Sequence, residues 1–240
     1  MHVKRSTIEK SWPVARKGTK YVVVASHNKK HGLPVLIILR DLLKIAKNRK
    51  EAKKILQEKK VLVDNKVVRK EEFTVLPFDL IQIGDKNYEL VFSGRGKFIL
   101  RETARKERIL KVINKKILKN KKTQLNLIYG KNILLDDKGK VNTGDSVVIE
   151  KEKIIKVLPV EVGREIIIFD GKYRGKEGKI EKIEKKIATI KCKEDKINAP
   201  IKTILVIKWK NLKIFTSSEI RGFLSAIKIS RFWGLNSEEI

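Results

Sequence analysis

Lys and Arg are the residues of this sequence that most clearly indicate a chemical function. The 240 residues include 57 Lys and Arg against 28 Asp and Glu, so the formal net charge is +29. A compact chain with this excess repels itself and is stabilised by a polyanion, most commonly nucleic acid. Lysine supplies 44 of the cations and arginine 13, although a compositional bias of the source genome would give the same balance. Because lysine suits backbone contact and counterion release, we predict binding through phosphates more than base reading.

The candidate phosphate contacts fall into four groups along the chain. The densest basic run covers residues 97–122, with eleven Lys and Arg and only the acids Glu102 and Glu107. A face that served only solubility would mix both signs, which favours a binding role for this run. Over the whole chain, the predicted RNA-binding residues are Lys4, Arg5, Arg40, Lys44, Arg49, Lys50, Lys53, Lys54, Arg101, Arg105, Lys106, Arg108, Lys172, Arg174 and Lys176.

Residues suited to catalysis or metal binding are scarce. His27 and His31 are four residues apart, but Gly32 and Pro34 argue against a helix that would present both to a metal. The only cysteine, Cys192, excludes a disulfide within the chain and a cysteine-based zinc site, and its alternating surroundings predict a buried strand position. No nucleophile elbow or phosphate-binding glycine loop occurs. We therefore expect no catalytic residue, no metal, no cofactor and no small-molecule substrate.

The sequence also gives expectations about location. No run of about eighteen apolar residues occurs, so no membrane span is expected. The first residues lack the apolar centre of a signal peptide. The single cysteine predicts a reducing compartment.

Hydrophobic periodicity predicts an α+β chain of several modules. Helical spacing covers residues 35–56, where Asn48 and Glu51 form a capping box, and Val61–Val68 reads as a hairpin. Apolar residues of the basic run also keep rough helical spacing, and short strands follow it. The predicted division is a basic N-terminal arm (1–34), a small α+β domain (35–96), a basic segment with a central β-module (97–165), a small barrel (166–210) and a helical tail (211–240) capped by Thr216 and Glu219. The alternative for residues 1–34 is a terminus without a fixed conformation.

Two motifs resemble known RNA-binding elements. Residues 48–56 and 60–67 resemble a small domain in which two helices and a hairpin grip structured RNA. This domain occurs in a bacterial small-subunit ribosomal protein, in pseudouridine synthases and in some aminoacyl-tRNA synthetases. The sequence departs from that family at Lys59 and Asn65, where glycine is frequent, but lysine keeps the charge and asparagine tolerates a left-handed turn.

The second resemblance is to the KOW motif of ribosomal and transcription elongation proteins, over residues 169–180. Gly171, Gly175 and Gly178 would allow a tight loop, from which lysine and arginine side chains reach phosphates.

The order of these parts resembles the family of the fourth small-subunit ribosomal proteins of the archaeal and eukaryotic type, over roughly residues 1–210. The resemblance implies that residues 35–96 form a small α+β RNA-binding domain and residues 166–210 an SH3-like KOW β-barrel. It also implies a structural protein of the small subunit, ribosomal RNA and neighbouring ribosomal proteins as partners, a cytoplasmic location and no catalysis. Two alternatives stay open: a free RNA-binding factor of chaperone or elongation type, and an RNA-modifying enzyme such as a pseudouridine synthase.

Overall fold

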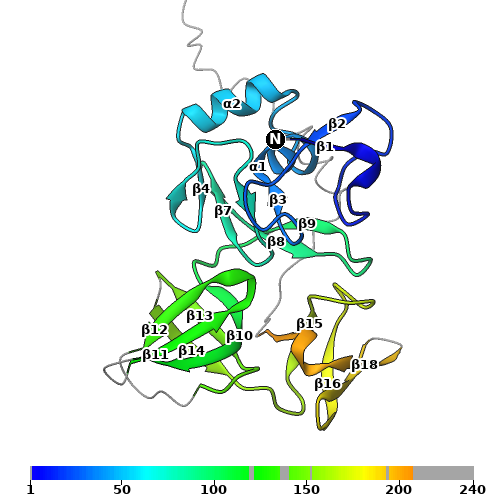
Figure 1. Cartoon of the computed structure of the whole chain (residues 1–240), viewed down its shortest axis with the longest axis vertical. Helices are drawn as coiled ribbons and strands as arrows, with labels where there is room; N and C mark the ends of the chain where they lie inside the picture. Colours follow the sequence, from blue (N-terminus) through cyan, green and yellow to red (C-terminus); the bar gives the residue numbers. More distant parts are fainter. Residues whose placement is uncertain (1, 119–121, 136–140, 152, 193–194, 208–240) are drawn as a thin grey trace, which may run out of the picture. The chain divides into compact units, whose positions relative to one another are not determined.

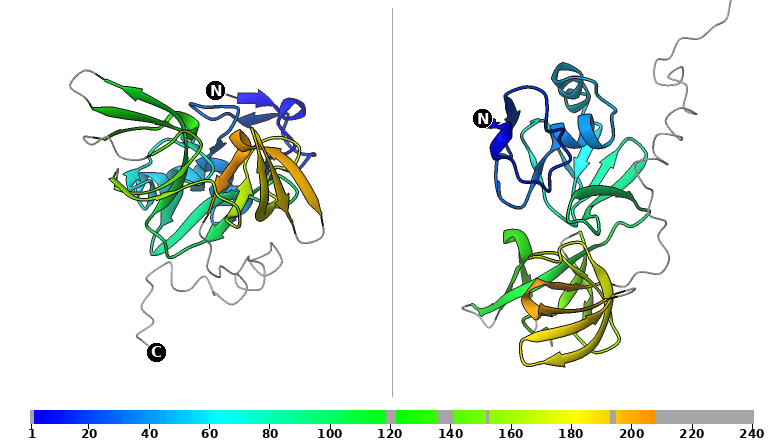
Figure 2. Two further views of the ribbon diagram at one scale, coloured as in Figure 1. Left: turned by 90° about the horizontal axis from the view of Figure 1, so that it is seen from below. Right: turned by 90° about the vertical axis from the view of Figure 1, so that its right-hand side faces the viewer.

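The computed structural model describes residues 2–118, 122–135, 141–151, 153–192 and 195–207 (Figure 1; Figure 2). In these residues the fold is mostly β with few helices, and its strands form three five-stranded sheets and two two-stranded pairs. Helices longer than one turn occur only in the first hundred of the described residues. The predicted tail helix with Thr216 and Glu219 lies outside the described residues.

The predicted helical region is confirmed, and its second helix is capped as expected. A helical turn, α1 (Val35–Ile37), continues as a π-helical turn, η2 (Ile38–Leu42), and is followed by α2 (Arg49–Gln57). The Asn48 side chain accepts a hydrogen bond from the Glu51 amide at 3.0 Å, while Glu51 accepts one from the amide of Lys47 at 2.7 Å. In the standard capping box the N-cap amide, here that of Asn48, donates to the glutamate, whereas here the donor is the amide of Lys47, one residue earlier. The two side chains still accept hydrogen bonds from backbone amides that have no partner within the helix.

The first sheet holds the predicted hairpin. Its order is β5-β4-β7-β8-β9, and every neighbouring pair is antiparallel. At the hairpin turn, Asp64 and Asn65 have φ values of 53° and 64°, and Lys59 before the hairpin has 58°. Asparagine and aspartate tolerate this left-handed conformation, which two-residue hairpin turns need. The strands are β4 (Val61–Val63), β5 (Lys66–Val67), β7 (Leu80–Ile83), β8 (Lys86–Phe92) and β9 (Phe98–Glu102).

The N-terminal residues are folded, in contrast to the arm predicted for them. Trp12, Val22 and Val23 are buried in the same hydrophobic cluster as the helices and the first sheet. Burying a large apolar side chain contributes roughly 1.5–3 kcal/mol, so these residues hold the segment in place. The segment contains β1 (His2–Lys4) paired with β2 (Tyr21–Val23), and β3 (Leu33–Pro34) paired with β6 (Thr74–Val75).

The basic run forms strands, so the helical spacing read from it was wrong. Residues 98–102 are β9, and β10 (Arg108–Ile117) pairs with β13 through its first half and with β11 through its second. A register shift between Val112 and Asn114 breaks the two-residue alternation, which is why the apolar positions imitate a helix. The second sheet, ordered β12-β11-β10-β13-β14, also contains β11 (Thr123–Leu127), β12 (Asn132–Leu135), β13 (Ser146–Glu150) and β14 (Lys153–Leu158).

The third sheet has the order β18-β17-β16-β15-β19. It confirms that short strands follow one another in the described part of residues 166–210. Its buried residues join one hydrophobic cluster with those of the second sheet, including Leu110, Val147, Ile167 and Ile204. Cys192 follows the end of a strand and is only half-buried, so its predicted position was wrong. The strands are β15 (Glu165–Ile168), β16 (Glu177–Glu184), β17 (Ile187–Lys191), β18 (Lys196–Pro200) and β19 (Ile204–Val206).

Candidate nucleic-acid interface

The helix α2 presents the most accessible group of the predicted cations. Ala52 and Leu56 are fully buried beneath it, so the lysines between them face solvent. Lys50, Lys53 and Lys54 are exposed, and Lys44 is exposed just before the helix. Positions three and four apart lie on one side of a helix, so Lys50, Lys53 and Lys54 lie on the same side of α2.

Arg49 is anchored at the edge of this group. Its Nε donates to both carboxylate oxygens of Glu71, at 2.8 and 2.9 Å, and Lys53 Nζ lies 3.7 Å from the same carboxylate. Hydrogen bonding to Arg49 lowers the pKa of Glu71 below its ordinary value. The Arg49 side chain is still 59% exposed. It therefore ties α2 to the segment before β6 and leaves one side of its guanidinium open to a ligand.

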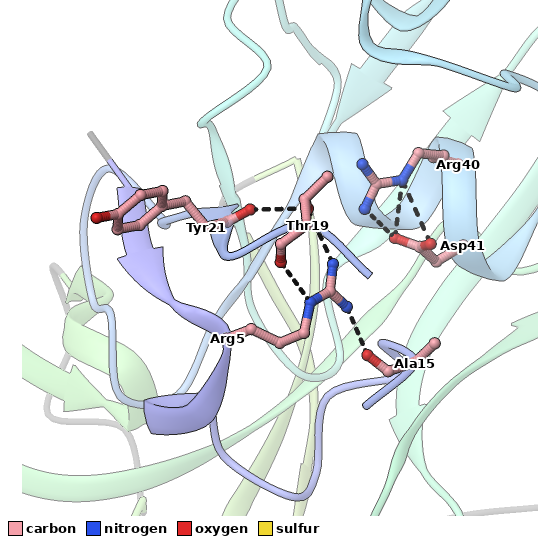
Figure 3. Close-up of polar contacts among 6 residues, drawn as sticks. All are labelled: Arg5, Ala15, Thr19, Tyr21, Arg40 and Asp41. Carbon is pink, nitrogen blue, oxygen red and sulfur yellow. Dashed lines mark hydrogen bonds and ion pairs between the residues drawn. The ribbon is translucent and has the colours of Figure 1, made fainter. Parts of the chain in front are cut away.

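Two predicted arginines are occupied within the fold (Figure 3). Arg5 donates to the Thr19 carbonyl at 2.7 Å, to the Thr19 hydroxyl at 3.0 Å and to the Ala15 carbonyl. Arg40 pairs with the neighbouring Asp41 at 2.7 Å and is half-buried. The first arginine therefore closes the loop before β2, and only the exposed Lys4 of that predicted pair faces solvent.

The predicted cations of the basic run are divided between surface and interior. Arg101 is buried, donates to Glu177 at 3.1 Å, and is paired in register with Glu89 on the neighbouring strand. Burial raises the pKa of Glu89 to about 7, against the opposing charges of Arg101 and Arg105. Lys106 is exposed. Arg101 is thus enclosed by carboxylates of the protein, and the prediction that it meets phosphate is not supported by its position.

A charge cluster links the first sheet to the second. Lys131 Nζ lies 2.7 Å from Asp64 and also contacts Asp79, while Arg108 pairs with Asp64. Burial raises the pKa of Asp79 to about 6, and the charge of Lys131 partly offsets this effect. Arg108 is therefore an internal ion-pair partner here, in contrast to its predicted role. No local pattern predicts this cluster, because its members are far apart along the chain.

Lys111 is also an internal cation, and its burial was not predicted from the sequence. Its side chain is buried, and Nζ donates to the carbonyls of Gly144, Ile201 and Ile204 at 3.0, 2.8 and 2.6 Å. Burial lowers the pKa of Lys111 to about 8, and the charge of Asp145 opposes that shift. Three carbonyl acceptors satisfy the three donors of an ammonium group, which explains how a lysine is tolerated there.

The predicted KOW loop packs against the turn that follows β8. Gly175 has a φ of +85°, and a Cβ added there would lie 1.9 Å from the Ser93 carbonyl oxygen, so only glycine fits. Arg174 stacks over Phe92 with 4.8 Å between its guanidinium carbon and the ring centre. Of the three predicted cations in this loop, Lys172 is exposed, while Arg174 and Lys176 are half-buried.

A hollow of about 910 Å³ lies between the hairpin turn of the first sheet and the second sheet. Exposed Lys66, Lys106 and Lys151 line it, with the charge cluster at its wall. Across the described parts of the chain, no group of three or more metal-ligating side chains occurs. Within those same ranges, no helix has the length and apolar character needed to cross a bilayer. The exposed lysines give the rim of this hollow a positive charge.

Comparison with known proteins gives consistent matches over most of the chain. Residues 84–154 match the model described as ribosomal family S4e, and residues 37–81 match the S4 domain. The small ribosomal subunit protein eS4 of Methanocella arvoryzae is 38% identical over 191 residues, covering 76% of this chain and 81% of the relative. That of Methanocaldococcus jannaschii is 34% identical over 200 residues, covering 77% and 82%. The crystal structure of the 30S ribosomal protein S4e from Thermoplasma acidophilum is 26% identical with a TM-score of 0.64, and the match covers 75% of this chain and 96% of that one.

Proposed function

Because the chain belongs to the small ribosomal subunit protein eS4 family, we propose that it holds ribosomal RNA in place as a structural constituent of the small subunit. The observation that carries this conclusion is the 38% identity over 191 residues to a relative of that name. The protein is a structural, RNA-binding protein of translation and not an enzyme. Neither the free-factor nor the pseudouridine synthase alternative has support among these relatives.

The RNA would be held mainly by exposed lysines. Neutralising phosphates releases counterions from RNA, and this needs charges that are accessible rather than paired inside the protein. The set best supported by exposure is Lys4, Lys44, Lys50, Lys53, Lys54, Lys106 and Lys172, with Arg40, Arg49, Arg105, Arg174 and Lys176 as partly occupied members. Arg5, Arg101 and Arg108 are left out, because their guanidinium groups serve the fold.

The arrangement of the sheets supports a working division of the chain. Residues 35–96 would act as the RNA-gripping domain, with residues 1–34 packed on it, residues 97–165 as a central β-module, and residues 166–210 as a KOW barrel. The support for a barrel is the five-stranded antiparallel third sheet and the glycine-dependent loop of Gly175. Neighbouring ribosomal proteins would contact the remaining surface, and the protein would reside on cytoplasmic ribosomes.

Sedimentation tests the proposal directly. A native lysate is run through a sucrose gradient in moderately high salt, and each fraction is blotted for the protein. We expect the protein to travel with the small subunit and to stay there as salt is raised. Recovery at the top of the gradient would instead identify a free RNA-binding factor, and the enzyme alternative would then be tested on isolated ribosomal RNA.

A further inference from the structure

Three asparagines form a row across the second sheet. Asn114 of β10 is the register partner of Asn126 of β11, which in turn is the partner of Asn132 of β12. Side chains of directly paired residues project from the same face of a sheet. Asn114 and Asn132 are exposed, and Asn126, in the central strand, is half-buried. The row therefore places three amide groups side by side on one open face.

The adjacent row on this face continues the polar pattern. Lys116, Gln124 and Leu134 are register partners across the same strands. Gln124 Nε2 donates to Asn126 Oδ1 at 2.8 Å, which orients the two amides next to each other. The opposite face carries Leu125 and Thr123, which are buried. We call the outward set the amide face, and it consists of Asn114, Lys116, Gln124, Asn126, Asn132 and Leu134.

The charge around the amide face indicates what could cover it. No Asp or Glu occurs from Arg108 to Leu135, the segment that contains all three strands of the face. A strand of the third sheet shows the contrast, since exposed positions of β16 carry Lys179, Glu181, Lys182 and Glu184. Mixed signs of that kind suit a surface in water. Strands β10 to β12 carry lysines and neutral amides and no acid of their own, although Asp64, Asp79 and Glu150 line the hollow that Asn132 and Leu134 also border. This combination is complementary to a polyanion that also presents uncharged hydrogen-bonding groups.

We propose that the amide face contacts RNA at ribose 2′-hydroxyls and base edges, in addition to the phosphate contacts made by lysines. An amide both donates and accepts hydrogen bonds, as do a 2′-hydroxyl and a base edge, whereas lysine can only donate. The minor groove of an RNA helix is wide and shallow and displays these groups, which suits a three-stranded face. This inference rests on the proposed function and names the chemistry of one further contact surface.

The test replaces the amides and leaves the charges. The full-length N114A/N126A/N132A variant is compared with the wild type in binding an in vitro transcript of small-subunit rRNA over a series of KCl concentrations. We expect the Kd to rise about tenfold or more, with the slope of log affinity against log salt unchanged, because no phosphate contact is lost. Nucleotides that wild-type protein protects from 2′-hydroxyl acylation should become reactive with the variant.

Matched variants keep the result interpretable. N198A removes an exposed asparagine from β18 in the third sheet and should bind like the wild type. Urea unfolding checks that the triple variant is folded. If its midpoint falls, N114A/N132A, which changes only exposed positions, is measured and should still weaken binding several-fold.

Four results would overturn the inference. Unchanged affinity would mean that RNA does not touch the face, and a reduced salt slope would mean that the face acts on phosphates. Unchanged RNA affinity with loss of incorporation into subunits would assign the face to a neighbouring protein. If the wild-type protein itself failed to bind the transcript, the proposed function would fail first, and this inference would fall with it.

Discussion

The helix α2 and the segment from Arg101 to Arg108 each carry four Lys and Arg residues, yet they use these charges differently. The lysines of α2 stand over buried Ala52 and Leu56 and face solvent. Arg101 and Arg108 instead meet carboxylates brought to them by distant parts of the chain. The role of a cation therefore depends on whether the fold brings an acid to it, which local charge density does not reveal.

The largest expected effect is the loss of stability on removing Arg108, one of the internally paired arginines. Arg108→Leu leaves Asp64 and the buried Asp79 with Lys131 alone, and removing one partner of a buried pair typically costs 3–5 kcal/mol. Because Arg108 is partly accessible, we expect a loss of about 2–4 kcal/mol in the free energy of unfolding, measured in urea. The control Lys106→Leu should leave stability nearly unchanged. Equal stability of the two variants would contradict the distinction between internally paired and exposed cations.

The next effect concerns the accessible side. Lys50→Gln together with Lys54→Gln removes two exposed charges from α2. We expect affinity for small-subunit rRNA to fall about 30-fold at 0.1 M salt and the salt slope to decrease by about two, because each phosphate contact contributes close to one. Binding is measured over a KCl series. If the same losses followed from Arg101→Leu in a folded protein, surface exposure would be the wrong criterion.

Glu89, the register partner of Arg101, should make the stability of the protein depend on pH. Burial raises the pKa of Glu89 to about 7, so between about pH 4.5 and pH 7 the folded protein holds a proton that the unfolded chain has released. The group's contribution to stability is therefore present at low pH and lost as pH rises through this window. Glu89→Gln should be more stable than the wild type by roughly 1–2 kcal/mol at pH 8, and the difference should vanish near pH 4. A difference that does not change with pH would contradict the assignment.

The smallest effect tests how α2 is held in place. Asn48→Ala removes the acceptor of the Glu51 amide and should lower the free energy of unfolding by about 1 kcal/mol. RNA affinity of the folded variant should stay close to that of the wild type, because no cation is lost. Asn48→Asp, which keeps the acceptor, serves as the control in thermal unfolding. A loss of affinity larger than the loss of stability would give Asn48 a direct role in binding.

Local signals were predictable from the sequence, and long-range ones were not. The Asn48 cap and the Asn65 turn depend on a few neighbouring residues, and both were found as predicted. The pairings of Arg101 with Glu177 and of Lys131 with Asp64 span 76 and 67 residues, so no local pattern announces them. The apolar residues of β10 show rough helical spacing because the irregular register of this strand hides its alternation. The buried Trp12 was a missed sign that the N-terminal residues fold.

The carbonyl-bound Lys111 has a consequence for the order in which the protein is made. Two of its three acceptors belong to Ile201 and Ile204, which are synthesised about ninety residues later. Until that part of the chain leaves the ribosome that translates it, the second sheet must keep a charged group unsatisfied or stay partly open. Completion of the second sheet is therefore expected to wait for the last strand of the third, which couples the two in a single late step of biogenesis.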